Sequence, residues 1–225
     1  IFTVSESLKK DYVESFNQDE SKVFVSYPAV DEADDFVPSE KHDDFVIGGM
    51  AGGGLNKGGY LLLLALRMMS KNCKVKARII FPKIHKSFFF KIMVKLLGLQ
   101  NRVEILPKQS NMSEYYKTID CYVLPSLNEA FGLVVTEAAS SFKPSLVSST
   151  TSVRELVKDG ENGFVFDREK NPLKNLSAKL CDVVDMYFNK YEKFVQISKN
   201  AHDISTNLDW QKFANVIIDN MIKES

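Results

Sequence analysis

The feature that most constrains the fold of this chain is a regular alternation of short apolar runs and longer helical patterns from Phe45 onward. We expect strands at 45–49, 76–81, 103–106, 121–124, 145–149 and 164–166. Helices are expected between them at about 57–70, 85–97, 112–119, from 131 and from 152, and the chain is helical from Pro172. Strands that alternate with helices form a parallel sheet with helices on both faces. The sequence therefore predicts an α/β fold of this kind.

Composition excludes several classes of protein. The 225 residues carry 29 basic and 29 acidic side chains, so no net positive field draws the chain to nucleic acid. A bound anion must then be held by a local cluster of groups. The three cysteines, Cys73, Cys121 and Cys181, form no CxxC or Cys/His pattern, which indicates neither a disulfide framework nor a zinc site. We expect them to be small core residues of a cytoplasmic protein.

The loop "GGMAGGGLNKGG", residues 48–59, follows the first strand of the alternation and precedes a helix. Glycines such as Gly49, Gly53 and Gly54 let a backbone approach a ligand closely, and Lys57 stands at the mouth of the loop. The stretch lacks the Gly-Lys-Ser/Thr triplet of a Walker A loop, and Lys57 occupies the last position of a GxGxxG pattern. Either a phosphate-binding loop or a plain flexible turn fits these residues.

The stretch "NEAFGLVVTE", residues 128–137, joins a strand to a helix that we expect to begin near Phe131. The amides at 131–134 then lack intrahelical partners and form an anion site with partial positive charge. One acid in a first helical turn would merely complement the helix dipole. Glu129 and Glu137 instead flank an apolar helix start, which predicts carboxylates that grip neutral hydroxyls, such as those of ribose or a hexose, beside a bound anion.

With these motifs in view, the chain resembles the C-terminal half of a GT-B glycosyltransferase of family 4, whose members are retaining enzymes that use nucleotide sugars. The resemblance is carried by "PSLNEAFGLVVTEAASSFKPSLVSSTTSVRELVKDGENGFVF", which contains the family's Glu-x7-Glu signature as Glu129 and Glu137. "LGLQNRVEIL", "TVSESLKKDY" and "YPAVDEADDF" resemble further parts of the family pattern. The resemblance implies a Rossmann-like, nucleotide-sugar-binding domain.

The same resemblance implies a division of the chain. Residues 1–43 would be a remnant of an N-terminal domain with the interdomain connector, and the chain, which opens without Met, would be part of something longer. Residues 44–205 would form the nucleotide-sugar-binding domain. Residues 206–225 would form a C-terminal crossover helix, capped by Asn207 and anchored by the packing of Trp210.

The resemblance also implies site roles for the two carboxylates and the glycine-rich loop. Glu137 would accept hydrogen bonds from the ribose hydroxyls, and Glu129 would contact the donor sugar at the reacting face. Lys57 would neutralise the leaving diphosphate, so Glu129 and Lys57 are the candidate catalytic residues. Gly49, Gly53 and Gly54 would border the diphosphate.

Further donor contacts are implied along the backbone. The loop with Ala130 leads to Phe131 and Gly132, whose amides would hold the sugar. The amides of Leu133 and Val134 would hold the diphosphate. Pro107 and Lys108 would border the base.

The implied chemistry is the transfer of a hexose from a UDP- or GDP-sugar with retention, without a protein nucleophile. No Asp-x-Asp triplet occurs, so we expect no metal and no other cofactor. The acceptor, a glycan, lipid or protein, would bind through the N-terminal domain, and the product would be a surface polysaccharide, glycolipid or glycoprotein glycan.

Some positions depart from the family pattern. Met50 stands where the family has an arginine, and Lys83 or Lys108 would have to supply the second cation. Thr151 and Ser152 replace a Gly-Gly pair. These changes support an alternative, a non-catalytic nucleotide-sugar-binding module. A third interpretation, a sugar-nucleotide epimerase, is disfavoured by the absence of GxGxxG.

The segment "HKSFFFKIMVKLL", residues 85–97, places Lys91 and Lys95 on a narrow polar strip of an otherwise apolar helix. Our main interpretation is a helix that packs on the sheet and against a neighbour with its lysines in solvent. The alternative is a basic helix in peripheral contact with the inner face of a membrane.

Overall fold

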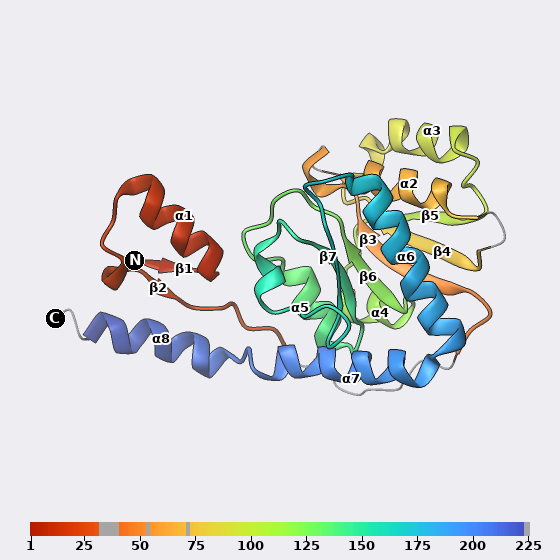
Figure 1. Ribbon diagram of the computed structural model, residues 1–225. Helices are drawn as coiled ribbons and strands as arrows, with labels where there is room; N and C mark the ends of the chain where they lie inside the picture. Colours follow the sequence, from red (N-terminus) through yellow and green to blue (C-terminus); the bar gives the residue numbers. More distant parts are fainter. Residues whose placement is uncertain (32–40, 53–54, 71–72, 223–225) are drawn as a thin grey trace.

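The computed structural model describes residues 1–31, 41–52, 55–70 and 73–222 (Figure 1). Gly53, Gly54 and most of the acidic stretch before Asp44 lie outside the described residues. The predicted α/β architecture is confirmed, because a parallel six-stranded sheet lies between two layers of helices.

The strands follow the predicted apolar runs to within a residue or two. Their order across the sheet is β5-β4-β3-β6-β7-β8. Their bounds are β3 (Phe45–Met50), β4 (Val75–Ile80), β5 (Val103–Leu106), β6 (Cys121–Leu124), β7 (Ser145–Ser148) and β8 (Phe164–Phe166). Four residues of β6 and four of β7 are fully buried, as expected for central strands covered on both faces.

Helices cover both faces of the sheet. One layer holds α2 (Gly59–Met68), α3 (Phe88–Leu96) and α6 (Pro172–Asn189), whose buried side chains form a single apolar core with that face. The other layer holds α4 (Met112–Lys117) and α5 (Leu133–Ser140). After α6 the chain continues through α7 (Tyr191–Thr206), which packs against α5, and ends in α8 (Trp210–Ile222).

The order of the strands creates a switch point in the sheet. The chain moves outward from β3 through β4 to β5, crosses back through α4, and then builds β6, β7 and β8 on the other side of β3. Helices after β3 and β6 therefore leave toward opposite faces, which opens a crevice beyond the carboxyl ends of these two strands. Both of the motifs singled out in the sequence begin at this crevice.

The N-terminal segment is a small unit of its own beside α5 and α8 (Figure 1). β1 (Phe2–Thr3) and β2 (Phe24–Val25) pair in parallel, and α1 (Glu6–Phe16) connects them. Ser5 caps α1, since its side chain accepts from the Leu8 amide at 3.1 Å.

Two predicted helix starts, at Ser152 and at Asn207, are wrong. The segment Ser152–Glu155 forms only a 3₁₀ turn, and Glu155 caps another helix, because its carboxylate accepts from the amides of Glu6 and Ser7 at the start of α1. Asn207 ends α7, and the start of α8 is capped by Asp209, which accepts from the Lys212 amide at 2.7 Å. Both errors arise because a capping side chain can serve any nearby helix end.

Replacement of Gly58 by alanine tests how closely the chain packs between β3 and α2. Gly58 has φ +68°, and a Cβ there would overlap the carbonyl oxygen of Pro125. Gly98 is the matched control, because it has φ +66° and open space around the Cβ position. We expect Gly98→Ala to cost about 1 kcal/mol from left-handed backbone strain alone. Gly58→Ala should cost at least about 3 kcal/mol, because it also displaces backbone.

Urea unfolding of both variants measures this difference. Equal losses of stability in the two variants would contradict the close packing of Gly58 against Pro125.

Candidate functional site

The site begins where the β3–α2 and β6–α5 loops are joined at the switch point. The Leu127 amide donates to the Asn56 carbonyl at 2.7 Å, which ties the two loops by their backbones. Gly58 lies next to this bond and packs directly against the Pro125 backbone. Only a residue without a side chain fits at this position. The glycine-rich loop is thus not a plain flexible turn at this end, and its last residues are fixed to the neighbouring loop.

An ion pair crosses the same junction. Lys57 Nζ lies 2.7 and 3.0 Å from the two carboxylate oxygens of Glu129. The Lys57 side chain is 40% exposed and that of Glu129 is 18% exposed. A pair this accessible to water contributes about 1 kcal/mol or less, so a bound anion can replace Glu129 as the partner of Lys57. The sequence predicted both residues for one site but not their mutual contact.

The start of α5 supplies free backbone donors. The helix begins at Leu133, two residues later than predicted, because Gly132 precedes it with φ 93°. A side chain at Gly132 would press on Leu124 and Val153, each 3.3 Å away. Within the described part of the chain, the amides of Leu133 and Val134 have no hydrogen-bond acceptor. They are the donors that a helix N-terminus offers to an anion.

The loop ahead of α5 is held by contacts to its carbonyl groups. Ser152 donates its amide to the Glu129 carbonyl at 3.2 Å, and Ser5 donates its hydroxyl to the Ala130 carbonyl at 3.0 Å. Phe131 is buried and packs on the Tyr27 ring, with centroids 5.8 Å apart. The N-terminal unit therefore positions the loop, a role that the sequence did not indicate.

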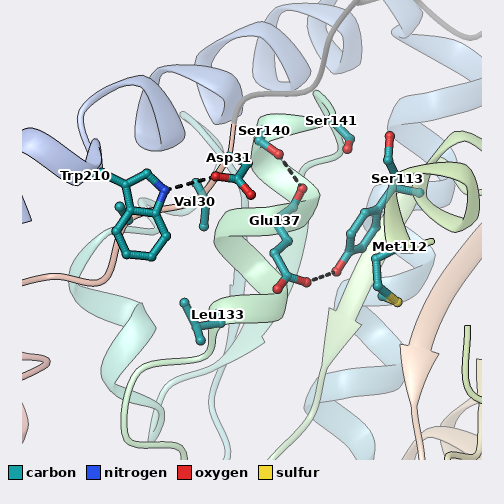
Figure 2. A pocket seen from close by; sticks show the side chains of 11 residues that line it. Val30, Asp31, Met112, Ser113, Leu133, Glu137, Ser140, Ser141 and Trp210 are labelled. Atoms are coloured by element: carbon teal, nitrogen blue, oxygen red, sulfur yellow. Dashed lines mark hydrogen bonds between the residues drawn. The ribbon is translucent and has the colours of Figure 1, made fainter. Parts of the chain in front are cut away.

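Glu137 lies on the wall of a cavity of about 450 Å³ (Figure 2). Its carboxylate accepts the Tyr116 hydroxyl at 2.9 Å and points toward the side of the cavity near Leu133 and Met112. Burial raises the pKa of the Glu137 carboxyl, and the hydrogen bond from Tyr116 lowers it by less. No arginine competes for this carboxylate among the described residues, so it retains capacity to accept further hydrogen bonds.

The other wall of this cavity comes from segments that the sequence assigned to a connector and a crossover helix. Val30 and Asp31 lie on it, and the Trp210 indole donates to Asp31 at 3.0 Å (Figure 2). Trp210 is 58% exposed and does not pack in the core of the described chain, so its role as an anchor of the crossover helix stays a prediction. An aromatic residue in an amphipathic helix carried no signal that distinguished a cavity wall from a core position.

A second cavity, of about 430 Å³, opens on the α3 side of Lys57. Met50 and Gly52 line it together with Lys83 and Lys86. Lys83 therefore lines the same cavity as Lys57 and Met50, where it can supply a second cation. Lys86 was not singled out from the sequence, although its spacing from Lys83 in the turn after β4 could have indicated it.

The remaining candidate residues lie farther from this junction or in the sheet itself. Pro107 and Lys108 follow β5 as exposed residues and line neither cavity. Gly49 is buried within β3, and its amide donates to the Tyr115 hydroxyl at 2.8 Å. Gly49 is thus part of the sheet and its amide is engaged by the fold, which does not support the predicted ligand contact.

Cysteines and metal ligands complete the inventory of reactive groups. The described chain holds no group of three or more His, Cys, Asp or Glu side chains that could bind a metal ion. The expectation of a metal-free site stays a prediction. All three cysteines are free, and only Cys121 is buried, so the prediction of core thiols is wrong for the exposed Cys181.

Comparison with known proteins gives the family context of this site. A family model described as "Glycosyl transferases group 1" matches residues 30–201. An uncharacterized glycosyltransferase of Haemophilus influenzae is 29% identical over 123 residues, which is 54% of this chain and 33% of that protein. One from Methanocaldococcus jannaschii is 28% identical over 191 residues, or 76% of this chain and 47% of that protein. The matches span less than half the length of either relative.

Solved structures share the fold. The crystal structure of Anabaena Alr3699/HepE in complex with UDP-glucose superposes with a TM-score of 0.83 and 19% sequence identity. The alignment covers 99% of this chain and 63% of the Anabaena chain. The six-stranded architecture is thus that of GT-B glycosyltransferases.

The raised pKa of Glu137 predicts a pH-dependent cost. The folded chain holds this proton more tightly than the unfolded chain, so the carboxyl lowers stability as the pH rises past its ordinary range. Glu137→Gln should therefore raise the melting temperature at pH 7, by about 2 °C or less after solvent screening, and leave it unchanged at pH 4.

Melting curves at both pH values measure the effect, and the exposed Glu169→Gln serves as control with no change at either pH. A Glu137→Gln variant that melts lower at pH 7 than at pH 4, relative to the parent, would contradict the assignment.

Proposed function

The chain belongs to the glycosyl transferases group 1 family, and on this premise we propose that it is the donor-binding half of a retaining, family 4 hexosyltransferase. Its substrate is then a nucleotide-diphosphate sugar, bound at the switch point of the sheet. The observation that carries the proposal is that the Lys57–Glu129 pair lies at the joined loops ahead of the unpaired α5 amides, while Glu137 lines a cavity together with Leu133.

The diphosphate is assigned to the start of α5. The free amides of Leu133 and Val134 point outward from a helix N-terminus that carries partial positive charge. Lys57 leaves Glu129 and pairs with the phosphates, since its present ion pair is weak in water and a phosphate offers more charge. Lys83, across the neighbouring cavity, supplies a second cation in place of the family arginine.

The two carboxylates then divide the sugars. Glu137 takes the ribose hydroxyls in its cavity, where partial burial strengthens each hydrogen bond. Glu129, released by Lys57, accepts from hydroxyls of the hexose at the reacting face. In this arrangement the carboxylates bind neutral hydroxyls, which avoids the repulsion that a direct contact with phosphate would cause.

The reaction follows from where charge develops. As the glycosidic bond breaks, negative charge accumulates on the departing diphosphate, and donors already in place stabilise it most in the transition state. The acceptor hydroxyl attacks on the face from which the diphosphate leaves and gives its proton to the departing phosphate oxygen, which retains the anomeric configuration without a protein nucleophile. We expect no metal, because Lys57, Lys83 and the helix start provide the neutralising charge.

The donor is proposed to be a UDP-hexose. The structurally similar Anabaena protein was crystallised with UDP-glucose, which supports this base over guanine. Pro107 and Lys108 stay predicted neighbours of the base, beyond β5. The acceptor, a glycan, lipid or protein, is assigned to an N-terminal domain, and the product to a surface polysaccharide or glycoconjugate.

One observation favours a second function, a non-catalytic nucleotide-sugar-binding module. Met50 lines the cavity beside Lys57 where the family has arginine, and the lysines that replace it offer a flexible ammonium in place of a planar, bidentate guanidinium. A module of this kind would bind the donor at the same residues but would not release the sugar.

Titration calorimetry with UDP-glucose tests the site. We expect micromolar binding, and Lys57→Ala and Glu137→Ala should each weaken it ten- to one-hundredfold, because each removes a charge-assisted hydrogen bond. Lys158→Ala is the control, since Lys158 pairs with Glu161 on the surface, and it should change nothing. Equal affinity in all three variants would overturn the proposed site.

A Glu129 variant distinguishes binding of the UDP part of the donor from binding of its sugar part. Glu129→Gln should leave UDP affinity unchanged or raise it severalfold, because Lys57 loses its competing partner. The same variant should reduce the advantage of UDP-glucose over UDP. If UDP itself bound tenfold more weakly to this variant, the exchange of Lys57 between carboxylate and phosphate would be wrong.

Catalysis is tested with the full-length protein and UDP-glucose. Release of α-glucose as the first anomer, lost in Glu129→Ala, would support a retaining enzyme. Donor binding without hydrolysis or transfer would support the module.

A further inference from the structure

The outer face of α3 exposes large apolar side chains. Phe88, Phe89 and Leu96 are 65%, 72% and 75% exposed. The opposite side of the helix is buried in the core through Phe90 and Val94. The main interpretation is confirmed for the buried side, since α3 packs in the core and against α2 with Lys91 and Lys95 exposed, but the outer face leaves large apolar groups uncovered. Contiguous exposed apolar groups of this size mark a surface that binds another phase or molecule.

Positive charge surrounds this apolar face. Residues 45–103 contain eleven lysines and arginines and no aspartate or glutamate, although three of these cations, Lys57, Lys76 and Arg78, pair with acids outside this range. Lys91 and Lys95 are exposed on α3 itself, and Lys83 and Lys86 lie in the turn just before it. None of these four lysines forms a salt bridge with another described residue. The local charge is therefore available to an anionic partner.

We propose that the outer face of α3, defined by Phe88, Phe89, Leu96, Lys91 and Lys95, docks on an anionic lipid bilayer. Phenylalanine and leucine side chains enter the acyl boundary, and the lysines extend along the surface to lipid phosphates. If two copies of this chain met through this face, the lysines of one copy would lie opposite those of the other. The repulsion between these like charges disfavours self-association through this face. Charge complementarity thus selects the lipid surface.

The proposed mode is peripheral. In the described part of the chain, no helix is long and apolar enough to cross a membrane. α3 lies at the periphery of the molecule beside α2, and α7 lies on the far side (Figure 1). The uneven distribution of charge along the chain orients the molecule on an anionic surface. The surface attracts the basic residues 45–103 and repels the acidic remainder of the chain.

Docking through α3 also places the donor crevice near the bilayer. Lys83 and Lys86 line the cavity that contains Lys57, so the turn before α3 borders both the proposed membrane face and the proposed donor site. This consequence rests on the proposed function, and it favours a lipid-linked acceptor among the three acceptor classes.

Vesicle co-sedimentation of the chain tests the docking independently of donor binding. We expect binding to vesicles of phosphatidylglycerol and phosphatidylcholine at low salt, and at least tenfold weaker binding to pure phosphatidylcholine. Lys91→Glu with Lys95→Glu should weaken binding at least tenfold, and Phe88→Ser with Phe89→Ser should do so even at low salt.

The matched control is Lys193→Glu with Lys199→Glu on α7, two exposed lysines with the same charge change, which should retain at least half of the parent affinity. Unchanged UDP-glucose affinity and melting temperature in the α3 variants show that the fold and the donor site are intact. Equal loss in the α7 control, no binding to either vesicle, or lipid-independent dimerisation lost in Phe88→Ser with Phe89→Ser would overturn the proposal.

Discussion

The structure depends on the junction of two loops at the carboxyl ends of β3 and β6. A backbone hydrogen bond from Leu127 to Asn56 and the contact of Gly58 with Pro125 fix the loops to each other. Because each loop leads to a helix on a different face of the sheet, their junction brings a cation and a helix N-terminus together. Lys57, Glu129 and the α5 amides are positioned by this one constraint, and donor binding as proposed requires all of them.

The pairing of Lys57 with Glu129 gives this site two states. In the closed ion pair, each charge neutralises the other. Breaking the pair costs little free energy, because Lys57 is 40% exposed and water screens the interaction. A diphosphate that arrives with its sugar offers a better partner to each of them, so ligand binding replaces one weak contact with two stronger ones. The site thus avoids an unpaired charge when empty, and in the proposed binding mode the same two residues recognise the two parts of the donor.

Much of the fold could be predicted from the sequence, because its strands are short apolar runs bounded by turns and its helices alternate with them. The start of α5 was placed two residues early, since the left-handed conformation of Gly132 is set by packing against Leu124 and Val153. Contacts between distant segments could not be predicted. Glu155 caps α1, and Trp210 bonds to Asp31, because tertiary proximity and not local spacing selects these partners. Neutral total charge also concealed the basic half of the sheet.

The most direct test of the central claim is a crystal structure of the chain with UDP bound. The account predicts that the diphosphate lies against the amides of Leu133 and Val134, that Lys57 Nζ has moved from Glu129 to a phosphate oxygen, and that Glu137 accepts from ribose. UDP bound elsewhere on the molecule, with the Lys57–Glu129 pair still closed, would contradict it.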